Sequence, residues 1–549
     1  MAHIDVSEIE YSLPDGRPLF HSVNFKLGRG DRAALIGPNG VGKSTLVAIV
    51  AGELSAQEGS VRRSGALAVM PQFIGKAIPG LTIRDLLVAT TSATVQAAAS
   101  ALSGAERVMS AMDDEKSQMS YAQALADWSD IGGFEVETSW DAITESALGV
   151  KFAAAQSYPV EMLSGGEQKR LVLEALFAGP HGLLILDEPD NYLDVAGKEW
   201  LETLMTTSDK TVLFISHDRQ LVANSATKII TLEPTGAGAV SWTHGGSLDS
   251  YDDARDHRTS RLDEMRKRWD EEHARLRTVV HTLREKSKYN DGMSARYHAA
   301  MTRLNRFEQA GPPIEVPRRQ RLAMRLQGGR TGKRALRCEK LSVPKRFRPF
   351  DTELLHGDRM AVLGPNGTGK THFLALLATE GNQDADLQGR TSRRSIAYTG
   401  GVQLGARVRT GYFSQTQARP DLANKTLLEV LHEGDNQRDG VGREDASRAL
   451  ARYGLARAAE QRYSELSGGQ QARFQILLLE LSGATMLLLD EPTDNLDFES
   501  AEALEEALND FQGTVVAVTH DRWFAKSFNR YLIFCKDGSV VESERPIWQ

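Results

Sequence analysis

Two glycine-rich segments, each with a lysine followed by a hydroxyl side chain, are the residues best suited to chemistry in this sequence. They are GPNGVGKST at 37–45 and GPNGTGKTH at 364–372. In such a segment backbone N–H groups surround phosphate oxygens, the lysine adds positive charge beside the β and γ phosphates, and the hydroxyl ligates magnesium. The sequence therefore predicts two sites for a nucleoside triphosphate with Mg²⁺. The predicted nucleotide-binding residues here are Gly37, Asn39, Gly40, Gly42, Lys43, Ser44, Thr45, Gly364, Asn366, Gly367, Gly369, Lys370 and Thr371.

Acidic residues follow two apolar runs that are typical of buried strands. Asp187 and Asp490 end the runs LLILD and MLLLD, where a carboxylate beside the phosphates can hold Mg²⁺. The adjacent Glu188 and Glu491 are suited to orient and deprotonate an attacking water. The sequence therefore predicts hydrolysis in both halves of the chain.

Four further polar residues recur in the same order in the two halves. A histidine follows another apolar strand in each half, where it can contact the γ phosphate, and a glutamine lies in a loop where it can sense metal and water. An isolated His or Gln is more often structural, but the recurrence favours a role in the site. The predicted catalytic residues are Glu188, Glu491, His217 and His520. The predicted metal ligands are Ser44, Gln72, Asp187, Thr371, Gln415 and Asp490.

Two LSGG segments supply a further anion-binding feature. Each places a serine and two glycines at the start of a helix, where free N–H groups and the positive end of the helix dipole suit an anion. Each of these helices can bind the nucleotide of its own half or that of the other half. The predicted residues are Ser164, Gly165, Gly166, Ser467, Gly468 and Gly469.

Tyr11 is the candidate for a contact with the base. It lies 26 residues before Gly37 and can stack on adenine, or it can be a core side chain. The matching position in the second half is Cys338, so either Phe347 or Phe350 takes that role there or adenine is held more loosely.

These motifs recur in the same order, so the chain is an internal repeat of two halves. Apolar runs before each glycine-rich segment predict buried strands, and the runs TLVAIVAG and HFLALLA after them predict helices. Each half is therefore predicted to be α/β, with a mainly parallel sheet and a ligand site at the carboxyl ends of its strands. A chain of 549 residues is also too long for one core.

A charged segment between the halves predicts a helical hairpin. Residues 247–286 form a predicted helix of about 60 Å, turn formers occupy the tip at 287–293, and a second helix runs over 294–310. The apolar face predicted for the first helix consists of Leu262, Met265, Trp269, Leu276, Val279 and Leu283.

Basic residues concentrate in the segment 281–334, which includes the tip and second helix of this hairpin, although the chain has a net charge of -8. Residues 281–334 hold 13 Lys and Arg against 4 Asp and Glu. Such an excess fits either a nucleic-acid contact or a solvated charged helix. On the nucleic-acid interpretation, the contacting residues would be Lys286, Lys288, Tyr289, Arg296, Arg303 and Arg306.

Composition excludes several classes of protein. Only Cys338 and Cys535 are cysteines, which excludes a disulfide scaffold and a four-cysteine zinc site. The N-terminus has no apolar run of the signal-peptide type, and no stretch approaches the roughly eighteen apolar residues of a membrane span. A cytoplasmic protein is therefore expected.

At these residues the chain resembles the ATP-binding cassette superfamily, and its architecture is similar to the ABC-F class. The resemblance covers essentially the whole chain, and it implies an α/β fold of two P-loop cassettes joined by a long α-helical hairpin, with no membrane subunit. The implied domains are the first cassette at 1–246, with an arm at about 88–130, the linker at 247–327 and the second cassette at 328–549.

For members of this class the resemblance implies a monomer that closes head-to-tail around two ATP molecules. Lys43, Ser44, Asp187 and Glu188 would then face 467–469, and Lys370, Thr371, Asp490 and Glu491 would face 164–166. The resemblance also implies ribosome binding near the tRNA exit site, with ribosomal RNA and tRNA as partners. The function would be protection against antibiotics or rescue of stalled ribosomes.

One departure from the family concerns the segment after each glutamate. The usual DEPTNHLD is here DEPDNYLD and DEPTDNLD, which places Asp190, Tyr192 and Asp494 at atypical positions and predicts unequal turnover of ATP at the two sites.

Two other classes of protein share part of the pattern. The ATPase of a membrane exporter would need separate membrane subunits and leaves the hairpin without a role, and a DNA-repair ATPase of the excision type would need zinc cysteines that the sequence lacks.

Overall fold

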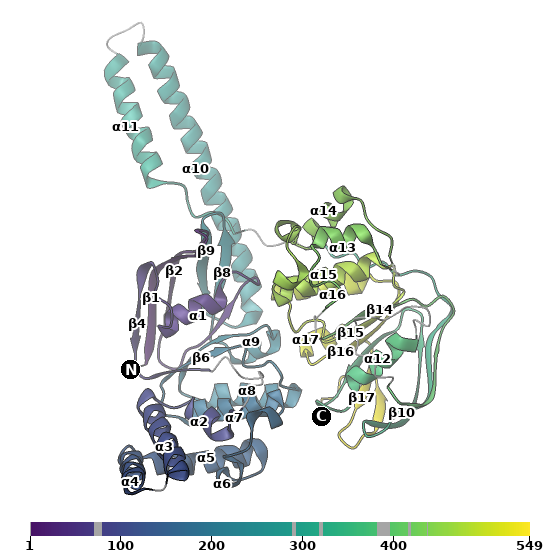
Figure 1. Ribbon diagram of the computed structural model, residues 1–549. Helices are drawn as coiled ribbons and strands as arrows, with labels where there is room; N and C mark the ends of the chain where they lie inside the picture. Colours follow the sequence, from purple (N-terminus) through teal and green to yellow (C-terminus); the bar gives the residue numbers. More distant parts are fainter. Residues whose placement is uncertain are drawn as a thin grey trace.

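The computed structural model describes residues 2–70, 80–112, 114–287, 293–317, 322–380, 396–415, 419–435 and 438–548. Two α/β bodies lie beside each other, and a pair of helices projects from the first (Figure 1). We call the elements before α10 the first half and those after α11 the second half. The predicted fold class, two α/β P-loop domains joined by a long helical hairpin, is confirmed.

A nine-stranded mixed sheet forms the centre of the first half, in the order β4-β1-β2-β9-β8-β3-β7-β6-β5. The run β8-β3-β7-β6-β5 is parallel, whereas β1 pairs antiparallel with β2 and β4, and β8 with β9. Strands β3, β6 and β7 are apolar and almost wholly buried, as expected of parallel strands covered on both faces. The strands are β1 His3–Ser12, β2 Pro18–Leu27, β3 Arg32–Ile36, β4 Glu58–Ser64, β5 Leu67–Val69, β6 Leu183–Asp187, β7 Thr211–Ile215, β8 Lys228–Thr235 and β9 Gly238–His244.

Helices cover this sheet and extend the first half at the end remote from the hairpin (Figure 1). Within the predicted arm, α3 and α4 pack against each other, and their starts are capped by Ser92 and Asp114. The buried rings of Trp128 and Trp140 join this helical layer to the core of the first half. The helices are α1 Lys43–Ala51, α2 Ile83–Val88, α3 Ala93–Ala111, α4 Glu115–Asp130, α5 Gly133–Leu148, α6 Phe152–Ala155, α7 Gly165–Ala178, α8 Val195–Thr207 and α9 Arg219–Ser225.

The second half repeats this plan with two sheets. The larger has the order β14-β15-β16-β12-β17-β18 and is parallel apart from β18, and a smaller antiparallel sheet has the order β11-β10-β13. The strands are β10 Arg334–Val343, β11 Phe347–Leu355, β12 Arg359–Leu363, β13 Thr399–Leu404, β14 Thr410–Phe413, β15 Met486–Asp490, β16 Thr514–Val518, β17 Arg530–Phe534 and β18 Val540–Ser543. The helices are α12 Lys370–Glu380, α13 Leu427–Glu433, α14 Arg443–Arg452, α15 Gly468–Leu481, α16 Phe498–Asp510 and α17 Arg522–Ala525.

The projecting hairpin consists of α10 Tyr251–Ser287 and α11 Ser294–Ala310. Its 37-residue first helix is about 55 Å long. The helices are joined by a small apolar cluster, by the stacked rings of Trp269 and Phe307 with centroids 5.2 Å apart, and by a hydrogen bond of 2.8 Å between His273 Nε2 and Glu308 Oε1. The buried members of that cluster are Leu276, Val280 and Leu304.

The predicted apolar face of the first hairpin helix is partly wrong. Met265 and Val279 are exposed, and Val280 is the valine that packs toward α11. Adjacent residues of a helix point in directions about 100° apart, so Val279 faces solvent at the same level where Val280 packs against α11. None of the described helices is long and apolar enough to cross a membrane.

Neighbouring valines test this packing. Val280→Ala removes buried methyl groups, so we expect α11 to lose about 1–2 kcal/mol of local stability. Val279→Ala is the matched control, because its side chain is 43% exposed against 8% for Val280. Hydrogen exchange of the α11 amides measures the difference, and equal exchange rates in the two variants would contradict the packing described.

Candidate functional site

The two glycine-rich segments adopt the same backbone conformation. Gly37, Gly40 and Gly42 have φ angles of 148°, 80° and 104°, and the three matching glycines of the second half have 137°, 82° and 102°. A Cβ on Gly37 would lie 2.6 Å from the carbonyl oxygen of Leu232, and one on Gly42 would lie 2.7 Å from the ring of Phe20. These positions therefore require glycine for both conformation and space.

The lysines that follow these glycines fold back over their loops. Lys43 Nζ donates to the carbonyl oxygens of Gly37 and Pro38 at 2.8 and 3.3 Å, and Lys370 Nζ makes the equivalent bonds at 2.7 and 2.8 Å. Both ammonium groups are buried, and burial lowers their pKa despite the nearby carboxylates. Each loop thus holds a cation at the start of its helix.

The acidic pairs lie at the ends of β6 and β15, as predicted from the apolar runs. In the second half, Thr371 Oγ1 donates to Asp490 Oδ1 at 3.3 Å. Burial raises the pKa of Asp490 to about 6, and burial also raises the pKa of Asp187, Glu188 and Glu491. Burial makes these carboxylates better proton acceptors than exposed ones.

Both site glutamates have an unusual backbone conformation. The φ angle is 48° at Glu188 and 47° at Glu491, in the left-handed region that side chains other than glycine rarely adopt. Such strain costs about 1–3 kcal/mol and occurs preferentially at functional sites. Its repetition at the same position of both halves indicates that it serves the orientation of the carboxylates.

Each glutamate lies beside the predicted histidine of its own half. Glu491 Oε2 accepts the backbone N–H of His520 at 2.9 Å, and its Oε1 is 3.6 Å from His520 Nε2. Glu188 Oε1 is 3.9 Å from His217 Nε2. Burial and the charge of Lys43 lower the pKa of His217 to about 3, and burial lowers that of His520, so both imidazoles are neutral near pH 7.

The LSGG serines cap their helices, as predicted. Ser164 accepts the N–H of Glu167 at the start of α7, and Ser467 accepts that of Gln470 at the start of α15. In each case the third helical residue bonds back to the serine N–H, so both helix starts carry a capping box.

Contacts between the halves bring each glycine-rich loop to the opposite LSGG segment. Asn366 Nδ2 donates to the carbonyl oxygen of Tyr192 at 3.2 Å, and the Tyr192 side chain covers Gly165. One cavity of about 710 Å³ is lined by residues of both halves. They include Ser164, Gly165, Gly166, Gly367, Gly369, Lys370, Thr371, Gln415, Glu491 and His520.

The same relation holds for the loop of the first half. Asn39 Nδ2 donates to the carbonyl oxygen of Asn495 at 3.0 Å, and the Asn39 N–H donates to Asp497 Oδ2 at 2.9 Å. A Cβ on Gly469 would lie 2.0 Å from Asn39 Nδ2. Sequence reasoning missed Asn495 and Asp497, although both follow Glu491 in a segment that the repeat singles out.

Several predicted residues lie away from the contacts between the halves, and others lie outside the described part of the chain. Tyr11 packs partly buried against the core, with its ring centroid 6.5 Å from that of Phe20. Phe347 and Phe350 are buried in the core of the second half, and a contact of either ring with a base stays a prediction. The remaining predicted site residues that lie outside the described residues are Gln72, Lys288 and Tyr289.

Gln415 and the basic residues of the hairpin are described. Gln415 Nε2 donates to Asp494 Oδ2 at 3.5 Å. Lys286, Arg296, Arg303 and Arg306 are all exposed, and Arg303 is 3.3 Å from Glu272 across the hairpin. Lys286 and Arg296 thus present positive charge to solvent near the tip of the hairpin, and Arg306 does so about halfway along α10, beside the Trp269–Phe307 stack.

Comparison with known proteins identifies the family of this chain. A sequence model of the ABC transporter family matches residues 20–191 and 347–494. An "Antibiotic resistance protein" of Mycobacteroides abscessus is 54% identical, with both chains covered completely. The tylosin resistance ATP-binding protein TlrC of Streptomyces fradiae is 30% identical over 96% of each chain, and the ABC transporter F family member 2 of Arabidopsis thaliana is 26% identical over 96% of this chain and 76% of its own.

A solved structure shares the fold. The structure titled "RNase-L Inhibitor" superposes with a TM-score of 0.56 at 19% identity, covering 98% of this chain and 89% of the other. The fold and the paired loops define a protein with two ATP-binding cassettes in one chain. Together with the family match and the relatives, they show that the chain belongs to the ABC-F family of ATP-binding cassette proteins.

Gly42→Ala tests the geometry of the first loop. The variant combines a φ of 104° with a Cβ 2.7 Å from the Phe20 ring, so we expect nucleotide affinity at this loop to fall about tenfold or more. Gly16→Ala is the control, because Gly16 has a φ of 82° but open space around a Cβ. Titration with a fluorescent ATP analogue measures both, and wild-type affinity in Gly42→Ala would show that the loop tolerates displacement.

Proposed function

We propose that this protein hydrolyses ATP at two sites, each formed by the glycine-rich loop of one half and the LSGG helix of the other. The observation that carries the proposal is the pair of contacts between asparagine and backbone carbonyl, Asn39 with Asn495 and Asn366 with Tyr192. Both sites close within one chain, so the active species is a monomer.

Each site has the groups that ATP with magnesium requires. The loop N–H groups and Lys43 or Lys370 bind the phosphates, and the N-terminus of the opposite LSGG helix binds the γ phosphate. Asp490 and Thr371 fit a magnesium ion, because their oxygens are adjacent and Asp490 Oδ2 is a buried oxygen that lacks a hydrogen-bond partner among the described residues. Magnesium, when bound, neutralises charge that develops on the phosphate oxygens.

Glu188 and Glu491 act as the bases that accept a proton from water. Their raised pKa favours proton uptake, and their strained backbone fixes the carboxylate direction. The neutral histidines His217 and His520 lie beside these glutamates and would contact the γ phosphate. His520 also holds Glu491 through its backbone N–H.

Replacing both glutamates separates binding from hydrolysis. In Glu188→Gln with Glu491→Gln the loops and lysines persist, so ATP still binds while turnover falls by about 100-fold or more. Phosphate release and retention of radiolabelled ATP measure the two steps. Near-normal turnover in the double variant would show that the glutamates are misassigned.

We further propose that the ATP-bound protein binds the ribosome through its hairpin, and so acts in the cytoplasm. Antibiotic resistance in the names of two relatives supports a ribosomal target, since many antibiotics act there. The exposed basic residues suit contacts with RNA phosphates. Protection against antibiotics, or rescue of stalled ribosomes, is the resulting function.

The base of the hairpin supports coupling between ATP and the ribosome. Arg255 of α10 is 3.1 Å from Glu499 of the second half and 3.6 Å from Glu233 of the first half. Arg258 adds a second ion pair to Glu233 at 2.6 Å. If the two halves moved apart, the contact between Arg255 and Glu499 would break. The orientation of the hairpin relative to the second half therefore depends on whether the halves are closed on each other.

Charge reversal tests the hairpin. Lys286→Glu with Arg296→Glu should weaken sedimentation with ribosomes about tenfold or more, most clearly at higher salt, because phosphate contacts are lost. Arg261→Glu with Lys267→Glu makes the same charge change on the exposed surface nearer the base and should bind as wild type does. ATP hydrolysis without ribosomes should be unchanged in both. Unchanged ribosome binding in the first variant would make the hairpin a spacer.

A further inference from the structure

Several charge differences between the two repeats occur in the segments that surround the site glutamates, and they include the following four. The second half has neutral residues where the first has two lysines and an aspartate, and it has an aspartate where the first has an asparagine. The pairs are Lys169 with Ala472, Asp190 with Thr493, Asn191 with Asp494 and Lys198 with Ala501. At these four positions, two additional lysines in the first half accompany one additional aspartate in each half.

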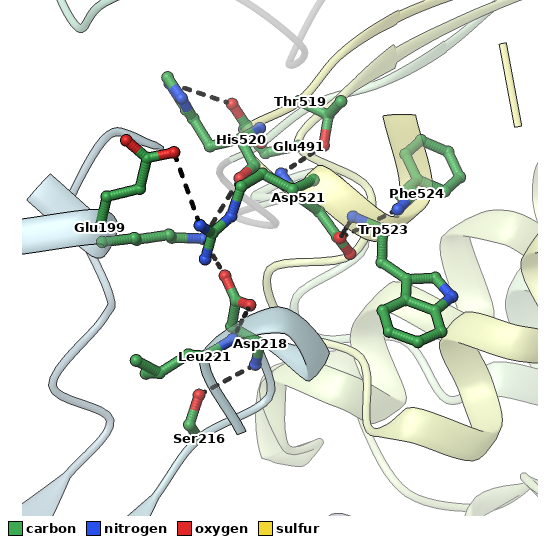
Figure 2. A network of polar contacts seen from close by, with 12 residues as sticks. Glu199, Ser216, Asp218, Leu221, Glu491, Thr519, His520, Asp521, Trp523 and Phe524 are labelled. Carbon is green, nitrogen blue, oxygen red and sulfur yellow. Dashed lines mark hydrogen bonds and ion pairs between the residues drawn. The ribbon is translucent and has the colours of Figure 1, made fainter. Parts of the chain in front are cut away.

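These residues come together between the halves. Lys198, on α8 of the first half, is 7% exposed, and its Nζ lies 2.9 Å from Asp218 Oδ2 and 3.5 Å from the carbonyl oxygen of His520 in the second half. The carboxylates of Asp190 and Asp494 also act on its charge. In Figure 2 Asp218 belongs to the first-half side of this network and His520 to the second-half side.

The charge of Lys198 is stable in this position. Burial by itself lowers the pKa of a lysine, but the carboxylates of Asp218, Asp190 and Asp494 outweigh that effect and raise the pKa of Lys198. The same contact lowers the pKa of Asp218 although burial opposes it. A buried cation of this kind is costly unless it is paired, so its partners must be held close.

Contacts lead from this ammonium to the proposed base of the second site. Lys198 approaches the carbonyl oxygen of His520, and the N–H of the same residue is bonded to Glu491 Oε2. Asp494 accepts a hydrogen bond from Gln415. Lys198 also lines the cavity that contains Lys370 and Glu491.

We propose that Lys198 is a positioning residue for hydrolysis at the second site, where it acts from the first half by holding the His520 backbone and Asp494 in place. The inference rests on the proposed ATPase function. At the first site the equivalent position is Ala501, which has no charge to offer. The two sites therefore differ because Lys198 is present at only one of them. Turnover at the second site then depends on closure of the halves, which brings Lys198 to it.

Steady-state ATP hydrolysis by the full chain tests this inference. Lys198→Ala should lower kcat by about tenfold while KM for ATP stays within about threefold, because the phosphate-binding groups are unchanged. Lys198→Arg should recover much of the loss, since it restores a cation. Lys210→Ala is the matched control, because Lys210 donates only to the Gly179 and His181 carbonyls of its own half among the bonds described and should keep wild-type kcat.

A second variant separates positioning from folding. Asp190→Thr with Lys198→Ala installs the residues of the second half and removes one carboxylate together with the cation. We expect its Tm to recover relative to Lys198→Ala while kcat stays low. Recovery of kcat together with Tm, or a wild-type kcat in Lys198→Ala, would overturn the inference. Absence of hydrolysis in the wild type would instead overturn the proposed function.

Discussion

The segment that follows each site glutamate must satisfy two halves of the molecule at once. In its own half it ends a buried strand and holds the glutamate at a strained φ angle of 48° or 47°. At the other half it supplies the carbonyl oxygen that an asparagine of the glycine-rich loop requires. The closure of the halves, the position of the glycine-rich loop and the direction of the glutamate carboxylate therefore depend on the same few residues. The loop must approach this segment closely, and the glycines of the LSGG segment leave room for that approach.

Asp497 illustrates this constraint in physical terms. Its carboxylate caps α16 through Ser500 and also accepts the Asn39 N–H from the other half. Burial opposes the charge, but these hydrogen bonds outweigh it and lower the pKa of Asp497. The carboxylate thus stays charged between the halves and stabilises their approach.

Much of the fold could be predicted because its signals are local. The strands that end at Asp187 and Asp490 are short apolar runs, and the second hairpin helix begins and ends where turn formers place it. Val279 was misplaced because Val279 and Val280 are adjacent and equally apolar, so spacing did not decide which of them faces α11. Phe347 could not be placed, since spacing from a loop does not distinguish a ring in the core from one at the surface.

Contacts between the halves were the least accessible to sequence reasoning. Asn495 and Lys198 act on residues about 300 or more positions away, so nothing local identifies their partners. A comparison of the two repeats could have found Lys198, because a charged residue opposite an alanine has to be explained by something outside its own half. The residues that the two repeats share thus predict the parts of the site that occur in both halves. The residues that differ between the repeats indicate where the two halves contact each other.

The number of ATP molecules held per chain tests the shared sites most directly. It is measured by equilibrium binding of a non-hydrolysable analogue to two double variants. If Lys43 and Ser467 belong to one site, Lys43→Ala with Ser467→Arg leaves one nucleotide bound, whereas Lys43→Ala with Ser164→Arg leaves none. The opposite pattern, with one nucleotide retained when Lys43 and Ser164 are changed together, would show that each half binds ATP alone and would contradict the account.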